Sequence, residues 1–405
     1  MVGSFALLAL AALEGAFGAR VAWRLICTAG GVTIAATDGA IAADNVDDKV
    51  TIVLPVLNER LRVAPCLDGL LAQGPAARDI LVVDGGSSDG TQALVAQYAA
   101  RDARIRLLDA SPIPPEWNGK AWGLHVGELQ SDPSTRWLLT IDADVFPAAP
   151  LTDALLAHAW RSGDVALSVA TRQRIEGLGE ALLHPALLTT LVYRFGAPGR
   201  STGRVRAVQA NGQCMLLRRD ALAAVGGFAA VSESICEDVT LARLLAARGY
   251  AVGFYEAGDL VSTRMYAGWR ETWRNWTRSL PLRDRYFGFS GWLGLLEVTF
   301  AQAAPLPTLA ALATYGGWLA LSHRAPALLE ALALGGAAVL LAGLLALRLG
   351  TLAGIARAYV RRPWSFWFSP LCDAPVAVRL WVMALRRRHS WRGRAIVRTT
   401  PAMPR

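Results

Sequence analysis

Between residues 50 and 142, short apolar runs alternate with stretches of helical periodicity. Four runs have the length and composition of buried strands: VTIVLPVL (50–57), ILVVD (80–84), RIRLL (104–108) and WLLTID (137–142). Residues 60–72 and 91–100 have the spacing of helices. Strands and helices that alternate in this way build an α/β domain with a mostly parallel sheet, which binds ligands at the carboxyl ends of its strands. We therefore expect the functional site among the polar residues that follow these strands.

Two later segments, 291–321 and 326–347, are nearly free of charge and long enough to span a bilayer. A third, 364–385, is also long enough but contains two prolines, an aspartate and an arginine. Arginine-rich segments lie on both sides of it, at 348–363 and after residue 385, and such segments belong on the cytoplasmic side. One crossing at 364–385 would separate them. We therefore predict a proline-broken re-entrant or interfacial segment there; the alternative is a third crossing that breaks the charge rule.

Composition agrees with a membrane protein. Apolar residues make up 53% of the chain, charged residues 18%, and the formal net charge is +9. Residues 1–18 are apolar apart from Glu14 and predict a short anchor or interfacial helix. The arginines cluster beside apolar segments and no nucleic-acid-binding motif occurs, so the basic balance suits arginine-rich cytoplasmic loops and we expect no nucleic acid partner. The five cysteines include no CxxC pair, which argues against a zinc site or a disulfide framework.

Acidic residues recur where the predicted strands end. Asn58 and Glu59 follow the first strand, Asp84 ends the second, and Asp142 and Asp144 end the fourth. Two carboxylates one residue apart can both reach a divalent ion, and Mg²⁺ or Mn²⁺ held there would bridge a diphosphate. The glycine-rich turn after Asp84 would let that carboxylate accept hydrogen bonds from a ribose or a base. The alternatives are a solvated turn at the first site and a tight, capped strand-to-helix connection at the second.

Two further polar features carry candidate chemistry. Lys120 lies behind Gly119 in PEWNGKAWGLHVG, as expected of a phosphate contact, although a surface lysine would read the same. Glu237 and Asp238 open a predicted helix in ESICEDVTLARLL. The helix dipole favours acids in a first turn, so they could serve as caps alone. Alternatively, Asp238 is a general base for an acceptor hydroxyl.

The segment WRETWRNWTRSL (269–280) combines aromatic and basic residues at helical spacing. In a helix its tryptophans would form one stripe and its arginines a neighbouring one: Trp269, Trp273 and Trp276, beside Arg270, Arg274 and Arg278. Aromatics toward the acyl boundary with arginines above them suit a membrane surface, whereas a buried stripe is the alternative.

Five motifs occur in the order found in family-2 glycosyltransferases, which the chain resembles over about residues 50–280. They are PVLNE, VVDGGSSDGT, IDADV, ANGQCMLLRRDALAAVGGF and CEDVTLARLLAARGY. The resemblance implies a GT-A fold, a nucleotide-diphosphate sugar donor (a UDP- or GDP-sugar) and Mg²⁺ or Mn²⁺. EWNGKAWGLHVG and the terminal WRGR (391–394) look closer to membrane-bound members that glycosylate lipids, such as the hopanoid-associated and carotenoid glycosyltransferases, and more distantly the ceramide glucosyltransferases.

The resemblance also implies roles for single residues. Asp238 would be the catalytic base, and Asp144 with Asp142 would hold the metal and the diphosphate. Candidate substrate-binding residues, Asp142 included, come from the same motifs and from the tryptophan–arginine segment: Pro55, Asn58, Glu59, Asp84, Lys120, Asn211, Gly212, Glu237, Arg274, Trp276 and Arg278. Two departures stand out. His125 replaces an asparagine common in the family, and Glu271 leads into TWRNW where processive polysaccharide synthases carry QxxRW, which argues against a polymerase.

We therefore predict four regions: an N-terminal hydrophobic anchor or interfacial helix with its linker (1–45), a GT-A domain (46–265), an amphipathic interfacial helix (266–288) and a membrane region with a basic tail (289–405). The predicted activity is inverting transfer of a sugar to a hydroxyl of a lipid acceptor, of carotenoid, hopanoid, glycerolipid or ceramide type. It would take place at the cell membrane, with the catalytic domain on the cytoplasmic face. The alternatives are transfer to a polyprenyl phosphate, which needs no base, and a non-catalytic nucleotide-binding membrane protein.

Overall fold

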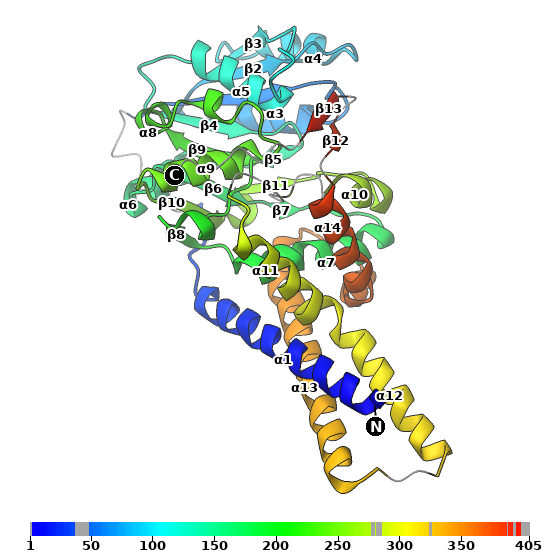
Figure 1. Cartoon of the computed structure of the whole chain (residues 1–405). Helices are drawn as coiled ribbons and strands as arrows, with labels where there is room; N and C mark the ends of the chain where they lie inside the picture. The colour runs from blue at the N-terminus through cyan, green and yellow to red at the C-terminus, as the bar shows by residue number, and fades with distance from the viewer. Residues whose placement is uncertain are drawn as a thin grey trace.

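The computed structural model places an α/β domain at one end of the molecule and long helices at the other (Figure 1). It describes residues 2–36, 48–276, 280, 286–323, 326–386, 388–391 and 394–397. Arg278 and the centre of the WRGR motif lie outside these ranges.

In the described part of the chain, eight strands form the central sheet, in the order β3-β2-β1-β4-β9-β6-β10-β8. They are β1 (Val50–Val56), β2 (Ala77–Asp84), β3 (Ile105–Asp109), β4 (Trp137–Ile141), β6 (Ala166–Ala170), β8 (Arg200–Thr202), β9 (Cys214–Arg218) and β10 (Val252–Glu256). The first four strands pair in parallel, as do β6 and β10. Only β9 and β8 run antiparallel to their neighbours in this sheet. The predicted mostly parallel α/β fold is confirmed, and the four strands predicted from the sequence are all present.

The sheet is buried on both faces because its strands are apolar at successive positions. Side chains alternate across a strand, so Ile52 and Leu54 of β1 pack into one core while Val53 packs into the other. The first core also takes its residues from α3 (Ala64–Leu71), α4 (Thr91–Ala99) and α6 (Leu151–Ser162). The second takes them from α5 (Gly119–Gln130), α8 (Arg219–Ala224) and α9 (Glu237–Ala247).

Shorter elements complete the domain. A small sheet consists of β5 (Val145–Pro147), β11 (Val261–Thr263) and β7 (Arg172–Gln173). Its strand β5 follows β4 in the chain after a short turn. The described single-turn 3-10 helices are η1 (Val205–Ala207), η2 (Phe228–Val231), η3 (Gly258–Leu260) and η6 (Ala356–Ala358). A strand pair, β12 (Arg388–Trp391) and β13 (Arg394–Val397), follows the last helix.

Three long helices extend away from the α/β domain and pack on one another: α1 (Val2–Thr28), α12 (Pro305–Leu321) and α13 (Leu328–Ile355) (Figure 1). By length and composition, α1 and the segment Leu328–Ala358 could each cross a membrane. The predicted crossing at 291–321 consists of two helices bent by 45°, which together remain a candidate for one broken span or a re-entrant loop; a π-helical stretch at Val298–Ala303 follows α11 (Phe289–Glu297).

The N-terminal helix is longer than the predicted stretch of residues 1–18. Glu14 does not interrupt it, because its carboxylate is buried and accepts a hydrogen bond from the Thr308 hydroxyl of α12 at 2.6 Å. Likewise α13 runs past the predicted end at residue 347. Arg348, the first residue of the arginine-rich segment 348–363 in the sequence analysis, therefore lies inside a helix and is buried.

The segment 364–385 is broken at Cys372 into a 3-10 helix, η7 (Trp364–Cys372), and α14 (Asp373–Leu385). It is long and apolar enough to be a candidate span. However, η7 packs along α7 (Leu178–Phe195), and α14 lies beside α7 and α10 (Trp269–Asn275) near the α/β domain, away from the far ends of α1, α12 and α13 (Figure 1). That placement fits an interfacial segment, which stays a prediction.

A buried ion pair joins these parts. The Arg348 guanidinium of α13 donates to both oxygens of Asp373 at 2.7 and 3.0 Å, and Gln302 donates to the same carboxylate at 2.7 Å. The side chains of Arg348 and Asp373 are 1% and 4% exposed. Since each charge depends on the other for compensation, this contact holds α13, α14 and the π-helical stretch at a fixed spacing.

We expect the substitution Asp373→Asn to destabilise the protein by about 3–5 kcal/mol, because it leaves the Arg348 charge buried and unpaired. Thermal unfolding of the detergent-solubilised protein measures this as a lower midpoint. Arg20→Gln is the matched control. Arg20 is 52% exposed, and Glu297 keeps its contacts with Arg24, so the loss should stay below about 1 kcal/mol. Equal midpoints for the two variants would contradict the role given to the buried pair.

Candidate functional site

A cavity of about 1440 Å³ lies at the carboxyl ends of β1 and β4. It is larger than the roughly 300–1,000 Å³ of ordinary small-molecule pockets, so it has room for more than one substrate. Most of the predicted site residues line its polar part: Pro55, Glu59, Lys120, Asp142, Asp144, Asn211, Gly212, Glu237 and Asp238. The structure therefore brings together residues that are nearly 200 positions apart in the chain.

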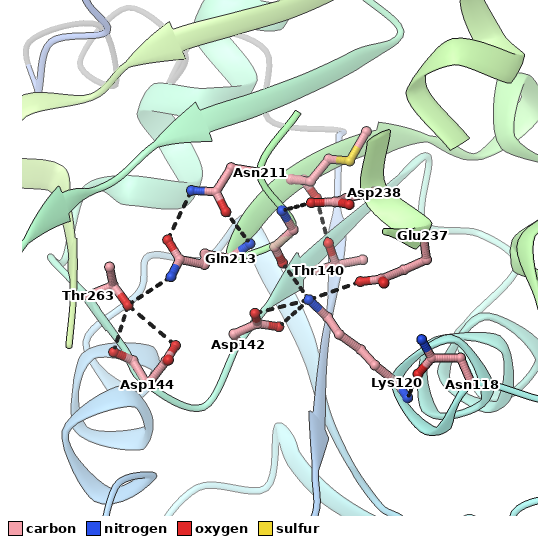
Figure 2. Close-up of polar contacts among 12 residues, drawn as sticks. Asn118, Lys120, Thr140, Asp142, Asp144, Asn211, Gln213, Glu237, Asp238 and Thr263 are labelled. Atoms are coloured by element: carbon pink, nitrogen blue, oxygen red, sulfur yellow. Dashed lines mark hydrogen bonds and ion pairs between the residues drawn. The ribbon is translucent and has the colours of Figure 1, made fainter. Parts of the chain in front are cut away.

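Lys120 lies at the centre of the polar part (Figure 2). Its Nζ is 2.7 Å from Oδ1 of Asp142 and 3.0 Å from Oε1 of Glu237, and it donates to the Gly212 carbonyl at 3.2 Å. Burial alone would lower the pKa of Lys120, but the charges of Asp142 and Glu237 outweigh it and raise that pKa. The lysine is thus held as a cation that joins the end of β4 to the start of α9.

The two aspartates after β4 differ in their partners. Asp142 is paired with Lys120, whereas Asp144 accepts a hydrogen bond from the Thr263 hydroxyl of β11 at 3.3 Å (Figure 2). Burial, and then the neighbouring Asp142 charge, raise the pKa of Asp144 to about 7. Burial also raises the pKa of Asp142, against the opposing effect of Lys120. Negative charge is therefore under-compensated on the side of Asp144, where a cation would be favoured.

The donor set fits a divalent cation only in part. Among the described residues, no group of three or more His, Cys, Asp or Glu side chains has metal-binding geometry. Asp142 and Asp144 supply hard carboxylate oxygens, and Mg²⁺ is commonly held by one or two carboxylates together with substrate phosphates and water. The pair therefore suits a cation that arrives with a diphosphate.

Asp238 faces the same cavity from the first turn of α9. Its Oδ2 accepts a hydrogen bond from the Gly212 amide at 2.5 Å, and its Oδ1 accepts one from the Val239 amide at 2.8 Å. Burial, and then the charge of Glu237, raise the pKa of Asp238 to about 7. A carboxylate with such a pKa can take up a proton near neutral pH, which is what a general base requires.

Gly212 separates the lysine from this carboxylate. A Cβ at this position would lie 2.8 Å from Lys120 Nζ and 3.1 Å from Asp238 Oδ2. Since its carbonyl accepts from Lys120 and its amide donates to Asp238, the glycine backbone itself links the two groups. The predicted motif residue is thus required by space and by hydrogen bonding.

Asp84 organises the turn after β2 and does not line the cavity, although its neighbours Val83 and Gly85 do. Its fully buried carboxylate accepts hydrogen bonds from the amides of Gly86 and Ser87 at 3.0 and 2.9 Å, and from the Gln92 side chain at 2.6 Å. The tight strand-to-helix turn weighed as an alternative is therefore present, but the N-cap of α4 is Gly90, which has no side chain to cap the helix; Asp89 accepts from the Thr91 amide at 3.0 Å. A nucleotide contact by Asp84 stays a prediction.

Asn58 and Glu59 lie on opposite sides of the same turn. Asn58, at φ 56°, accepts a hydrogen bond from the Ser88 amide at 2.9 Å and is exposed outside the cavity. Glu59 lines the cavity and is paired with Arg62 at 3.0 Å. Only the second of these two predicted residues therefore faces the other acidic groups.

The tryptophan–arginine segment differs from its prediction. The described helix α10 covers Trp269–Asn275 rather than 266–288. Trp269 is half-exposed, but Trp276 is 7% exposed, lines the cavity and stacks on His184 with ring centroids 4.5 Å apart. The tryptophans therefore do not share one membrane-facing stripe, because the chain folds Trp276 into the interior.

Arg274 is exposed and does not line the cavity, whereas Glu271 and Asn275 of the same helix do. The structure does not bring Arg274 to Asp142 or Lys120, and its predicted part in substrate binding stays a prediction. The matching prediction for Arg278 lies outside the described residues.

Several residues of the site could not be named from the sequence. Gln213 donates to Thr263 at 3.2 Å, and Thr263 in turn holds Asp144 (Figure 2). Gln213 stands in the quoted motif ANGQC, which was a usable signal. Thr263, which lies on the small sheet and donates to Asp144, and His184, which lines the cavity from α7, belong to none of the quoted motifs.

A mostly parallel sheet, with an aspartate pair after β4 and an acidic pair opening a helix beside it, agrees with the GT-A domain that the resemblance implies. Residues 51–226 match the family model described as Glycosyl transferase family 2. This stretch of the chain therefore matches a family-2 glycosyltransferase domain, in agreement with the resemblance carried by the five motifs.

Named relatives agree with this assignment. The chain is 27% identical over 296 residues to the succinoglycan biosynthesis protein ExoA of Rhizobium meliloti, which covers 68% of this chain and 87% of that protein. It is 25% identical over 238 residues to the 4,4'-diaponeurosporenoate glycosyltransferase of Staphylococcus aureus, covering 57% of this chain and 60% of the relative. The carotenoid type of relative expected from the sequence is thus found.

Solved structures include the mannosyltransferase PcManGT of Pyrobaculum calidifontis in complex with GDP-Man and Mn²⁺. It is 18% identical at a TM-score of 0.47, with 92% of this chain and 99% of that chain covered. Glucosyl-3-phosphoglycerate synthase of Mycobacterium tuberculosis, in complex with Mn²⁺ and UDP, is 19% identical at a TM-score of 0.38, with 57% and 77% covered.

We expect Lys120→Met to lower sugar transfer by on the order of 10²-fold, because the charge that holds Asp142 and Glu237 in place is lost. Lys120→Arg should recover part of the rate. Release of nucleotide diphosphate from a sugar donor measures the effect, and circular dichroism checks the fold. Transfer by Lys120→Met at the wild-type rate would show that the lysine is dispensable.

Proposed function

We propose that the protein is a membrane-bound inverting glycosyltransferase that moves a sugar from a UDP- or GDP-sugar to a hydroxyl of a lipid acceptor. The observation that carries the proposal is the position of Asp238. It faces the same cavity as Asp142 and Asp144, and that cavity continues along α1, α7 and α13. A base, a diphosphate-binding end and an apolar wall therefore share one space.

The donor would bind at the polar end of the cavity. Lys120 would remain beside Asp142 and balance negative charge on the diphosphate. Asp144, with Asp142, would hold Mg²⁺ or Mn²⁺, which when bound supplies further charge stabilisation to the leaving diphosphate. Glu59 and Asn211 line the same end and are available for contacts with the donor.

The acceptor hydroxyl would lie against Asp238. Its carboxylate would remove the hydroxyl proton as the oxygen attacks the anomeric carbon, on the face opposite the leaving diphosphate. The two backbone amides that donate to Asp238 fix the direction of the carboxylate. For a general base, being aligned with the proton that it removes matters before its pKa does.

A hydroxyl fits better here than the phosphate of a polyprenyl carrier. Of the five arginines that line the cavity, four donate to carboxylates or to a carbonyl: Arg62 to Glu59, Arg172 to Asp259, Arg357 to Glu256 and Arg362 to the carbonyl of Ala356. A phosphate would also meet the charges of Glu237 and Asp238. A neutral hydroxyl needs no arginine partner and is not repelled by Glu237 and Asp238. It also gives Asp238 a proton to remove.

The apolar helices support a place at the membrane. Among the residues that the structure describes, three helices are long and apolar enough to cross, or up to four if the bent pair is one span. Arg357, Arg361 and Arg362 follow α13 close to the α/β domain. By the positive-inside rule, that end and the catalytic domain would face the cytoplasm.

We expect Asp238→Asn to lower transfer by about 10²–10⁴-fold, because the amide cannot accept the proton. Binding of the nucleotide sugar, measured by calorimetry with Mn²⁺ present, should persist. Glu233→Gln is the matched control, because this nearby exposed acid does not line the cavity and its removal should change neither value. Transfer by Asp238→Asn at the wild-type rate would remove Asp238 from the mechanism. Absence of donor turnover in the wild-type protein would favour a non-catalytic nucleotide-binding role.

The pKa of Asp238, raised to about 7 by burial and by Glu237, sets a pH dependence. Only the ionised carboxylate accepts a proton, so kcat/KM should rise with pH through about 7 and be about tenfold lower at pH 6 than on its plateau. Rates at low acceptor concentration, with donor binding measured at each pH, test this. A flat profile over this range would indicate an acceptor that is already ionised, as a polyprenyl phosphate is.

A further inference from the structure

The cavity has a second, apolar part between three helices. It is lined by side chains and glycines of α1, α7 and α13: Leu25, Ile26, Leu188, Leu191, Val192, Phe195, Leu347, Gly350, Gly354 and Ile355. We call this part the apolar lobe. It shares one cavity with Asp238 and the aspartate pair, so whatever fills it is connected to the reacting groups.

We propose that the apolar lobe holds the hydrocarbon chain of the acceptor, and that the missing side chains at Gly350 and Gly354 set its width. This inference rests on the proposed function. It adds to that function the place where the acceptor lies and the residues that select it. The occupant is a membrane lipid, because the wall is hydrocarbon and two of its three helices, α1 and α13, are candidate membrane spans.

The lobe is open toward the outside of the helices. Ile26 is 70% exposed, and Gly350 and Gly354 are also exposed. A lipid could therefore enter sideways from the bilayer, between α1 and α13, and bring its polar end to Asp238. A soluble, polar acceptor would leave this apolar wall in contact with water. The free energy lost would be proportional to the apolar area of the wall.

The two glycines of α13 differ from those that serve helix packing. At Gly15 and Gly18 of α1, an added Cβ would lie 2.8 and 2.2 Å from the side chains of Leu340 and Leu344. At Gly350 and Gly354 it would meet no atom within 4 Å. Because positions four apart share one face of a helix, both glycines face the same open space. They widen the lobe and are not needed for close contact between helices.

The double variant Gly350→Leu with Gly354→Leu tests the proposal in the full-length protein. Gly343→Leu is the matched control, since it lies on the same helix, meets no atom within 4 Å and does not line the cavity. Each protein is reconstituted in nanodiscs with lipids extracted from producing cells and supplied with radiolabelled UDP- and GDP-hexoses and Mn²⁺. Label that moves to the organic phase reports transfer, and free sugar in water reports donor hydrolysis.

We expect the ratio of transfer to hydrolysis to fall about tenfold or more in the double variant and to stay at the wild-type value in Gly343→Leu, because added side chains exclude the acceptor and leave the donor end intact. A double variant with the wild-type ratio would overturn the proposal. So would an equal fall in both variants, because the effect would then belong to the helix and not to the lobe.

A second readout judges the lobe even if the proposed function fails. A diazirine-bearing C16 fatty alcohol is photolysed with the same nanodiscs, and labelled peptides are identified by mass spectrometry. Label on residues 188–195 of α7 is expected in the wild type and in Gly343→Leu and should be lost in the double variant. Absence of that label in the wild type would refute the lobe as a lipid site. Wild-type protein that transfers no radiolabel to the organic phase, yet is labelled on α7, would refute the proposed lipid-glycosylating activity alone.

Discussion

The geometry of the site depends on one buried cation among carboxylates. Asp142, Asp144, Glu237 and Asp238 surround one cavity, and like charges at this spacing in a poorly hydrated space repel one another strongly. Lys120 contacts Asp142 and Glu237 directly. It is linked to Asp238 through the backbone of Gly212. Asp144 is the exception. The two acidic motifs can therefore coexist without a ligand, while the uncompensated charge remains where a donor and its cation would bind.

A second constraint fixes the apolar side of the cavity. In a bilayer, helices gain little from the hydrophobic effect when they associate, so close packing at small residues and polar contacts between helices decide how they pack. Arg24 of α1 donates to Glu297 at 2.7 Å, and Arg348 of α13 is paired with Asp373 of α14. These contacts lie near the α/β domain rather than at the far ends of the helices. They hold α1 and α13 at a defined spacing around the lobe.

The sequence predicted the parts of the protein that are encoded locally. The four strands, the helix at Glu237 and the position of Asp142 and Asp144 follow from periodicity and from the rule that ligands bind at strand ends. That Lys120 and Asp238 belong to the same site is what the family resemblance implied. It failed where a distant contact decides the outcome. Glu14 stands out in the apolar stretch of residues 1–18, but its partner Thr308 is almost 300 residues away. Trp276 was assigned to a membrane-facing stripe, but its partner His184 is on another helix.

The same distinction explains why the acceptor side is harder to read than the donor side. Donor chemistry requires charged and polar groups, and these leave short motifs in the sequence. The wall of an acceptor site for a lipid consists of leucines, valines and glycines, which are also what any membrane helix contains. What sets Gly350 and Gly354 apart is only that the space beside them is open and joined to Asp238. If the lobe holds the acceptor as proposed, selection of a lipid would reside in side chains that are absent, which only a three-dimensional structure can show.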